Sequence, residues 1–184
     1  HPSIMAANAE LTPPPLHGVP TSKEKRYDRQ LRLWAASGQA ALEEAHILLI
    51  NNGPGVVGVE TLKNLILPGI GQFTILDSTL VSEQDLGVNF FLDESTLGTF
   101  RAESSRRLLQ ELNPDVQGHA ITEPLQAFVA REGALNPYTL VLVTAPVTPD
   151  VLEVISTHCH THAVPLFYIH CSGFYSHFSL SLPP

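Results

Sequence analysis

HILLINNGPGVVG, residues His46–Gly58, is the stretch of this 184-residue chain that decides its fold. It begins with an apolar run that is typical of a parallel strand buried on both faces. A Gly-x-Gly-x-x-Gly loop follows, formed by Gly53, Gly55 and Gly58. A helix-like segment comes next, and then a second apolar run, residues 72–76, which leads into Asp77. This order of strand, glycine loop, helix, strand and acid predicts a nucleotide site of the kind that doubly wound folds build.

Each glycine of the loop has a physical role in such a site. The first permits the tight turn, the second lets the backbone approach a phosphate, and the third lets the helix pack on the strand. Asp77 lies 24 residues after Gly53, close to the roughly 20 expected of an acid that holds ribose hydroxyls. The alternative is a tight turn with no ligand, since Pro54 removes an N–H donor and the branched Val56 and Val57 would crowd a phosphate. The sequence leaves both interpretations open.

Apolar runs and helix-like segments alternate along the rest of the chain. The expected strands are residues 46–50, 72–76, 116–121, 139–144, 164–169 and 177–182. The expected helices are residues 39–45, 55–66, 99–112, 125–132 and 150–160, besides one that begins near Thr21; residues 78–94 are expected to be irregular. The alternation predicts a Rossmann-like, doubly wound α/β fold with a largely parallel sheet flanked by helices.

The N-terminal segment differs in composition from the rest. Residues 1–20 contain five prolines and little apolar periodicity, which predicts a disordered Pro-rich tail. Thr21 and Glu24 have the spacing of a capping box, so an N-terminal helix is expected to begin there. We expect residues 21–184 to form one domain. Because the sequence stops directly after an expected strand, we expect this domain to be cut from a longer chain.

Charge and composition limit the kinds of partner. The net charge is −8, yet five of the ten Lys and Arg residues lie in Lys23–Arg32. The acidic remainder argues against a nucleic-acid surface. The apolar runs are far shorter than the roughly 20 residues that span a bilayer, and no secretory signal is visible. Two cysteines are too few for a disulfide framework, so we expect an intracellular protein.

Several segments together resemble one family of adenylation domains. They are YDRQLRLW (Tyr27–Trp34), LKNLILPGIG (Leu62–Gly71), TILD (Thr74–Asp77), NFFL (Asn89–Leu92), RAE (Arg101–Glu103) and LQELNPDV (Leu109–Val116). Residues 22–182 are similar to the ThiF/MoeB-type domains of ubiquitin-like modifier activating enzymes and their bacterial sulfur-carrier relatives. LGVNFFL and INNG make the non-catalytic, regulatory subunits of heterodimeric neddylation activators the nearest likeness, with those of sumoylation activators as the alternative.

The resemblance implies which groups an active member needs. Such a member adenylates the C-terminal glycine of its modifier with ATP and magnesium. Its glycine loop and ribose acid, matched here by Gly53, Gly55, Gly58 and Asp77, hold the nucleotide. An Asn and an Arg after that acid grip the phosphates, a Lys at the start of the next helix adds charge, and an Asp after the fourth strand holds the metal. Phosphoryl chemistry depends on such positioned charge.

This chain departs from that pattern at the positions that would contact the phosphates and the metal. Glu83–Leu92 has no basic residue, and Asp85, Val88 and Phe90 stand there instead; Asp85 would repel a phosphate. Arg101 replaces the Lys, a swap that keeps the charge but changes the geometry. Ala145–Pro149 carries no carboxylate. We therefore expect a pseudo-adenylation domain that binds no metal, whose glycine loop is empty, and that leaves ATP and magnesium to its partner.

Arg29, in YDRQ, is the one residue to which the resemblance assigns a catalytic role. The matching arginine reaches across the subunit interface toward the partner's ATP, and a planar, always charged guanidinium suits that task. The alternative is a surface arginine paired with Asp28, Glu24 or Glu44. The implied partners are a catalytic subunit and a ubiquitin-like modifier, with neither nucleic acid nor membrane, in the cytoplasm and nucleus.

Other side chains have weaker claims to a role. His158 and His162 stand four residues apart near Cys159, yet no Cys-x-x-Cys pair accompanies them, so no metal is expected. Neither Cys159 nor Cys171 has a context that would lower its pKa. Trp34 and the Phe90–Phe91 pair could lie in the core or at a dimer surface; we expect the ring of Trp34 in the core.

Two further functional hypotheses stay open. The glycine loop and Asp77 alone would also suit a genuine dinucleotide-binding enzyme of the oxidoreductase type. A third possibility is that these residues have no function apart from the remainder of a longer chain.

Overall fold

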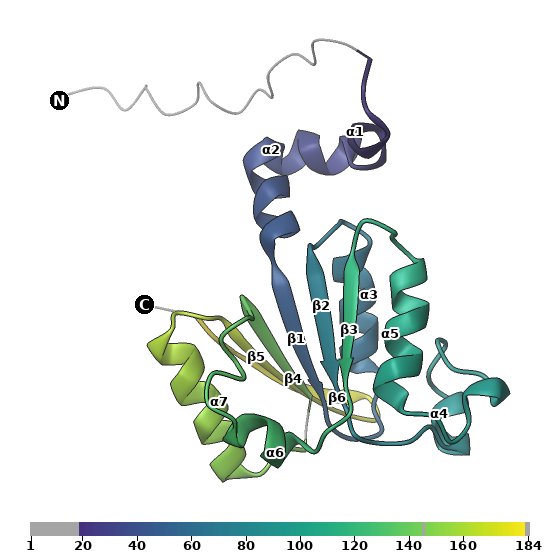
Figure 1. The fold of residues 1–184 in the computed structure, drawn as a ribbon, viewed down its shortest axis with the longest axis vertical. Coiled ribbons are helices and arrows are strands. Elements are labelled where there is room, and N and C mark those ends of the chain that lie inside the picture. The colour runs from purple at the N-terminus through teal and green to yellow at the C-terminus, as the bar shows by residue number, and fades with distance from the viewer. Residues whose placement is uncertain (1–18, 145, 183–184) are drawn as a thin grey trace.

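A computed structural model describes residues 19–144 and 146–182 of the chain (Figure 1). The predicted tail, residues 1–20, lies almost wholly outside the described residues, as does Ala145. In the part that is described, no helix is long and apolar enough to cross a membrane.

A six-stranded sheet forms the centre of the structure, in the order β3-β2-β1-β4-β5-β6. The strands are β1 (His46–Asn51), β2 (Gln72–Leu76), β3 (Gln117–Ile121), β4 (Leu140–Thr144), β5 (Leu166–Ser172) and β6 (Tyr175–Ser181). All neighbours pair in parallel except β5 and β6, which form an antiparallel hairpin. The predicted doubly wound α/β fold is confirmed.

Helices cover both faces of the sheet (Figure 1). They are α3 (Val57–Ile66) and α5 (Arg101–Glu111) on one face, and α6 (Leu125–Ala130) and α7 (Pro149–Thr161) on the other. Central strand β1 contributes to both cores: Ile47 and Leu49 pack with α3 and α5, whereas Leu48 and Ile50 pack with α6 and α7. Successive side chains of a strand point to opposite faces, which is why an unbroken apolar run forms this strand.

The N-terminal helices lie at the amino ends of the strands (Figure 1). They are α1 (Ser22–Arg26) and α2 (Asp28–Glu44), and the predicted capping box of Thr21 and Glu24 is present. The sequence predicted a separate helix over residues 39–45, but α2 includes these residues up to Glu44 and kinks instead at Trp34 and Ala35, where Ala35 has a φ of 58°. Trp34 is only half-buried, and its indole Nε1 donates to Gln39 Oε1 at 3.2 Å.

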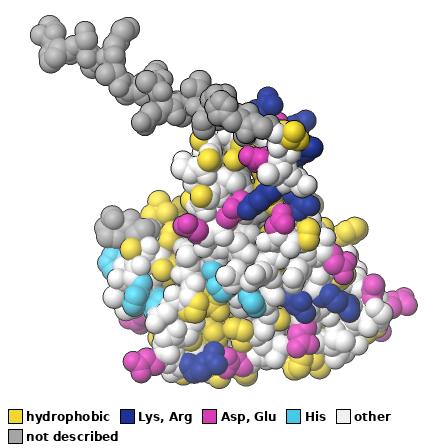
Figure 2. All heavy atoms as spheres, turned by 45° about the horizontal axis from the view of Figure 1, so that its top comes forward, with side chains coloured by type: hydrophobic (Ala, Val, Ile, Leu, Met, Phe, Trp, Pro, Cys, Tyr) yellow, Lys and Arg dark blue, Asp and Glu magenta, His cyan; other side chains and the backbone are white. Residues whose placement is uncertain are grey.

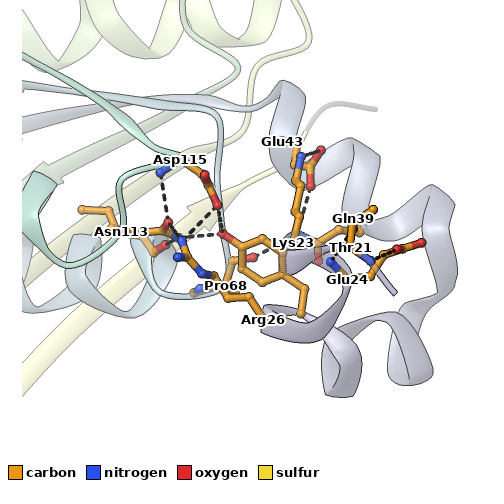
Figure 3. Close-up of polar contacts among 11 residues, drawn as sticks. Thr21, Lys23, Glu24, Arg26, Gln39, Glu43, Pro68, Asn113 and Asp115 are labelled. Carbon is orange, nitrogen blue, oxygen red and sulfur yellow. Dashed lines mark hydrogen bonds and ion pairs between the residues drawn. The ribbon is translucent and has the colours of Figure 1, made fainter. Parts of the chain in front are cut away.

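Polar contacts fix α1 against the connection between α5 and β3 (Figure 3). Arg26 donates to Asn113 Oδ1 at 2.9 Å and to Asp115 Oδ2 at 3.0 Å. Tyr27 is 2% exposed, and Asn113 Nδ2 donates to its hydroxyl at 2.8 Å. A Cβ on Gly69, which has a φ of +90°, would lie 2.7 Å from the Tyr27 ring. Gly69 therefore permits both the turn and the burial of the tyrosine.

The connection between β2 and α5 is built from short pieces. It contains α4 (Glu83–Leu86) and the 3-10 turn η1 (Glu94–Thr96), each opened by a capping box. These pieces lie within and beside the stretch that was expected to be irregular. Phe91 packs into the core at 7% exposure, whereas Phe90 is 90% exposed, so only one of the two phenylalanines fills space inside the domain.

Candidate functional site

The glycine loop lies where β1 ends and α3 begins, at the carboxyl edge of the parallel strands (Figure 1). Gly53 has a φ of +111°, a backbone conformation that favours glycine. A Cβ on Gly58 would lie 2.6 Å from Leu49 Cδ1, so this glycine lets α3 approach β1 closely. A Cβ on Gly55 would meet nothing within 4 Å. Two of the three glycines are thus explained by the fold itself.

A groove of about 590 Å³ runs along this loop. Its walls include the apolar side chains of Pro54, Val56, Val57, Val88, Pro146 and Ile169. Among the residues that the structure describes, no lysine or arginine lines the groove. A triphosphate carries several negative charges and needs cations or aligned donors to neutralise them. The groove that occupies the usual nucleotide crevice is therefore poorly suited to phosphates.

Asp77, the predicted ribose acid, is buried and fully engaged with its own chain. Its Oδ2 accepts from Arg101 Nε at 2.6 Å and from Asn51 Nδ2 at 2.8 Å. Its Oδ1 accepts from the backbone N–H of Thr79 at 2.9 Å. The Asp77 side chain is 1% exposed. Ribose binding by Asp77 stays a prediction, because in this structure the carboxylate holds protein donors.

Arg101 connects three segments around this carboxylate. Besides Asp77, its guanidinium contacts Asp85, with Nη1 to Oδ1 at 2.9 Å, and the carbonyl oxygen of Gly53, with Nη2 at 2.8 Å. The residue is 4% exposed. Burial by itself would lower the pKa of Arg101, but the two carboxylates outweigh it and raise that pKa. The guanidinium is therefore a permanent buried cation.

Asp85 is the second carboxylate of this network. Its Oδ2 accepts from both the backbone N–H and the hydroxyl of Ser82 at 2.8 Å. Burial by itself raises the pKa of Asp85, yet the Ser82 hydrogen bonds and Arg101 hold it below its ordinary value. The sequence predicted that Asp85 repels a phosphate; the structure adds that its charge is neutralised by Arg101. Compared with the pattern of active members, the sequence has an additional acid at position 85 and an arginine in place of the lysine at position 101. This was the only feature of the sequence that could have indicated the Asp85–Arg101 pair.

Arg29 lies far from the glycine loop. It stands in the first turn of α2, three residues after Arg26, which contacts the loop at the amino end of β3. The glycine loop follows the carboxyl end of β1, and a six-residue strand spans about 20 Å. Arg29 therefore cannot serve this chain's own loop.

The Arg29 side chain is exposed and makes no ion pair among the described residues. Two of the expected alternative partners are engaged elsewhere, since Asp28 pairs with Arg32 at 3.1 Å and Glu24 accepts from the backbone of Thr21. Figure 2 shows basic and acidic side chains together around the α1–α2 end, with further side chains of both kinds on the body of the domain. The Arg29 guanidinium therefore faces solvent without an ion-pair partner among the described residues.

The histidines and cysteines form no comparable site. The rings of His158 and His162 stack with centroids 4.1 Å apart, but within the described ranges no three potential metal ligands come together. Burial raises the pKa of the Cys159 thiol to about 11, which makes it a poor nucleophile at neutral pH. Cys171 is exposed.

Comparisons with known proteins agree with the geometry. The chain is 49% identical over 128 residues to the NEDD8-activating enzyme E1 regulatory subunit of Gallus gallus, covering 69% of this chain and 24% of that protein. It is 41% identical over 163 residues to the Nedd8-activating enzyme E1 regulatory subunit of Drosophila melanogaster, covering 88% and 30%. The chain thus spans less than a third of the length of these relatives.

A solved structure of PaaA shares the fold, with a TM-score of 0.75 at 16% identity, over 89% of this chain and 56% of that one. Residues 27–184 match the sequence model of the ThiF family. Fold, glycine loop and sequence similarity lead to one conclusion: the chain belongs to the ThiF family.

Proposed function

We propose that this chain is the adenylation-like part of a regulatory subunit of the NEDD8-activating enzyme. In this role it supports a catalytic partner, which binds ATP and magnesium and adenylates the C-terminus of the modifier. The names of the relatives, at 41% to 49% identity, support this role. They do not favour the sumoylation subunit or the dinucleotide oxidoreductase. The same role implies an intracellular protein of cytoplasm and nucleus.

One observation carries the proposal that this half is not itself catalytic. The carboxylate expected to hold the ribose, on Asp77, is bound to Arg101 and Asn51 within the protein. The neighbouring groove is lined mostly by apolar side chains, with Thr144 and His170 among its polar ones, and no described lysine or arginine lines it. Adenylation requires positioned charge around the reacting phosphate. The one buried cation of the described residues, Arg101, is held by two carboxylates of its own chain, so it is not available to a phosphate.

Arg29 is the group through which this chain would contribute to chemistry in its partner. It is exposed, and none of the ion pairs within the described part of the chain involves it. An arginine supplied in trans to a transferring phosphate accelerates the reaction by about 10³-fold or more. We propose that Arg29 reaches the ATP of the catalytic subunit and stabilises the charge that develops there.

Modifier-dependent ATP–pyrophosphate exchange by the assembled heterodimer tests this function. Arg29→Ala is expected to slow exchange by at least about 100-fold while the two subunits still copurify. Arg32→Ala is the matched control, because Arg32 lies one turn further along α2, is exposed and pairs with Asp28. Unchanged exchange in Arg29→Ala would remove the in-trans role. Exchange by the regulatory subunit without its partner would overturn the non-catalytic assignment.

A further inference from the structure

The guanidinium of Arg101 joins the two groups between which a doubly wound fold holds a ribose. In such folds the nucleotide runs from the first glycine turn to the acid that follows the second strand. Here Arg101 donates to the carbonyl of Gly53 at 2.8 Å and to Asp77 at 2.6 Å. The space between the glycine turn and the acid is thus bridged by a side chain of the protein.

We propose that Arg101 is the residue that excludes nucleosides from this half of the activating enzyme. Its guanidinium occupies the position of the ribose and takes up the carboxylate that would accept the ribose hydroxyls. This inference deepens the proposed function and rests on it in one respect, namely that the glycine loop is the counterpart of a nucleotide site. It assigns the exclusion to a single residue rather than to the apolar groove alone.

The network around Arg101 is built to resist displacement. The side chains of Arg101, Asp77 and Asp85 are 5%, 1% and 6% exposed. A nucleoside entering this space would separate a buried cation from its carboxylates, and its uncharged hydroxyls could not replace that pairing. Breaking a buried ion pair on one side is strongly unfavourable because it leaves the other charge uncompensated. An uncharged ribose therefore cannot compete with the guanidinium.

The same contacts hold the glycine loop in place without a ligand. The Nη2 atom of Arg101 binds the carbonyl of Gly53, while Nη1 binds Asp85 in α4. One side chain thereby links the glycine loop to the β2–α5 connection. The conformation of these two segments therefore does not depend on a bound nucleotide.

The test removes the guanidinium together with one of its carboxylates, in the full chain. Arg101→Ala alone would leave two buried acids unpaired, so Asp85→Asn is combined with it. Asp77 then keeps its donors Asn51 and Thr79. Arg106→Ala, on the same helix and bound to Gln110 at 3.3 Å, is the matched control. The ligands are adenosine and 2′,3′-dideoxyadenosine, which carry no phosphate and differ only in the ribose hydroxyls, and binding is followed by calorimetric or NMR titration.

The expected result is binding of adenosine by the R101A/D85N chain, at least about tenfold tighter than dideoxyadenosine, since a carboxylate then accepts the hydroxyls. The unmodified chain and R106A should bind neither nucleoside at millimolar concentration. A folded R101A/D85N chain that does not distinguish the two nucleosides would overturn the proposal. So would an unmodified chain that binds adenosine as tightly as the variant.

A second variant keeps the proposal testable should R101A/D85N fail to fold. Lys carries its charge at one point and cannot contact three acceptors as Arg does. Arg101→Lys is therefore expected to accelerate amide hydrogen exchange at Gly53–Val57 and at α4, with no change in R106A. Unchanged exchange at both segments would contradict the proposal. The pyrophosphate-exchange test of Arg29 does not involve this network, so the two proposals fail independently.

Discussion

Arg29 and Arg101 make opposite use of the same side chain at opposite ends of the sheet. Arg29, at the amino ends of the strands, is exposed and forms no ion pair with any described residue. Arg101, at the carboxyl ends, is 4% exposed and contacts two carboxylates and a backbone carbonyl. Doubly wound folds hold their ligands at the carboxyl end of the sheet. In this chain the side chain of Arg101 fills that place. The amino end carries the charge that remains available to another molecule.

The comparison predicts that Arg101 is the larger contributor to stability by far. Arg101→Met leaves Asp77 and Asp85 buried without their cation. We expect the free energy of unfolding to fall by about 3 to 5 kcal/mol, measured by urea denaturation. Arg29→Ala should leave the denaturation midpoint unchanged, because its side chain is exposed. Equal effects of the two substitutions would break the comparison.

Gly69→Ala tests the packing beneath the amino-end helices. The new Cβ would lie 2.7 Å from the Tyr27 ring, at a backbone φ of +90°. Strain and displacement of the tyrosine together should cost about 2 kcal/mol of unfolding free energy. Gly55→Ala meets nothing within 4 Å and serves as the control. A stabilised Gly69→Ala chain would show that Tyr27 is not held as described.

Acid should weaken the carboxyl-end network by protonating Asp85, whose carboxylate pairs with Arg101. Because the pKa of Asp85 is lower in the folded state, its stabilisation is fully present above the pKa of an unfolded aspartate, about 3.9. It is lost as the pH falls through the folded pKa, that is, below about pH 4. Melting temperatures between pH 6 and pH 3 should fall less steeply for Asp85→Asn. Parallel pH profiles would contradict this linkage.

Tyr27→Phe should have the smallest effect. It removes the hydrogen bond that Asn113 Nδ2 donates to the tyrosine hydroxyl at 2.8 Å. Asn113 still donates to the carbonyl of Ile66, so the loss should be about 1 kcal/mol, measured by chemical denaturation. If Tyr27→Phe lowered the free energy of unfolding as much as Arg101→Met does, the polar contact that stabilises the domain most would lie at the amino end of the sheet instead.

Local pattern predicted most of the fold. The strands were found because they are short apolar runs, and the glycine loop because its spacing is specific. The separate helix expected over residues 39–45 is instead part of α2, which kinks at Trp34–Ala35. Gly38 lies inside α2 and packs so closely against Trp34 that a Cβ on it would be 2.8 Å away. Propensity alone could not anticipate that packing.

The site was predictable in its parts but not in its pairing. Asp77, Asp85 and Arg101 were each singled out from the sequence, and the absence of basic residues at 83–92 was visible. Their mutual contact was not, because Arg101 pairs with acids 16 and 24 residues away, and no periodic pattern relates positions so far apart. Only the fold brings the end of β2, α4 and the start of α5 to one point.

The placement of β1 between two cores also has a consequence for how the chain folds. This strand pairs with β2, whose partner residues lie 26 positions later, and with β4, whose partner residues lie 93 positions later. Until β4 and α7 exist, Leu48 and Ile50 lack most of the side chains that bury them. Pairings between strands that are distant in the sequence slow folding and leave aggregation-prone intermediates. During synthesis, we therefore expect the face of β1 that carries Leu48 and Ile50 to stay partly exposed until β4 and α7 have been made.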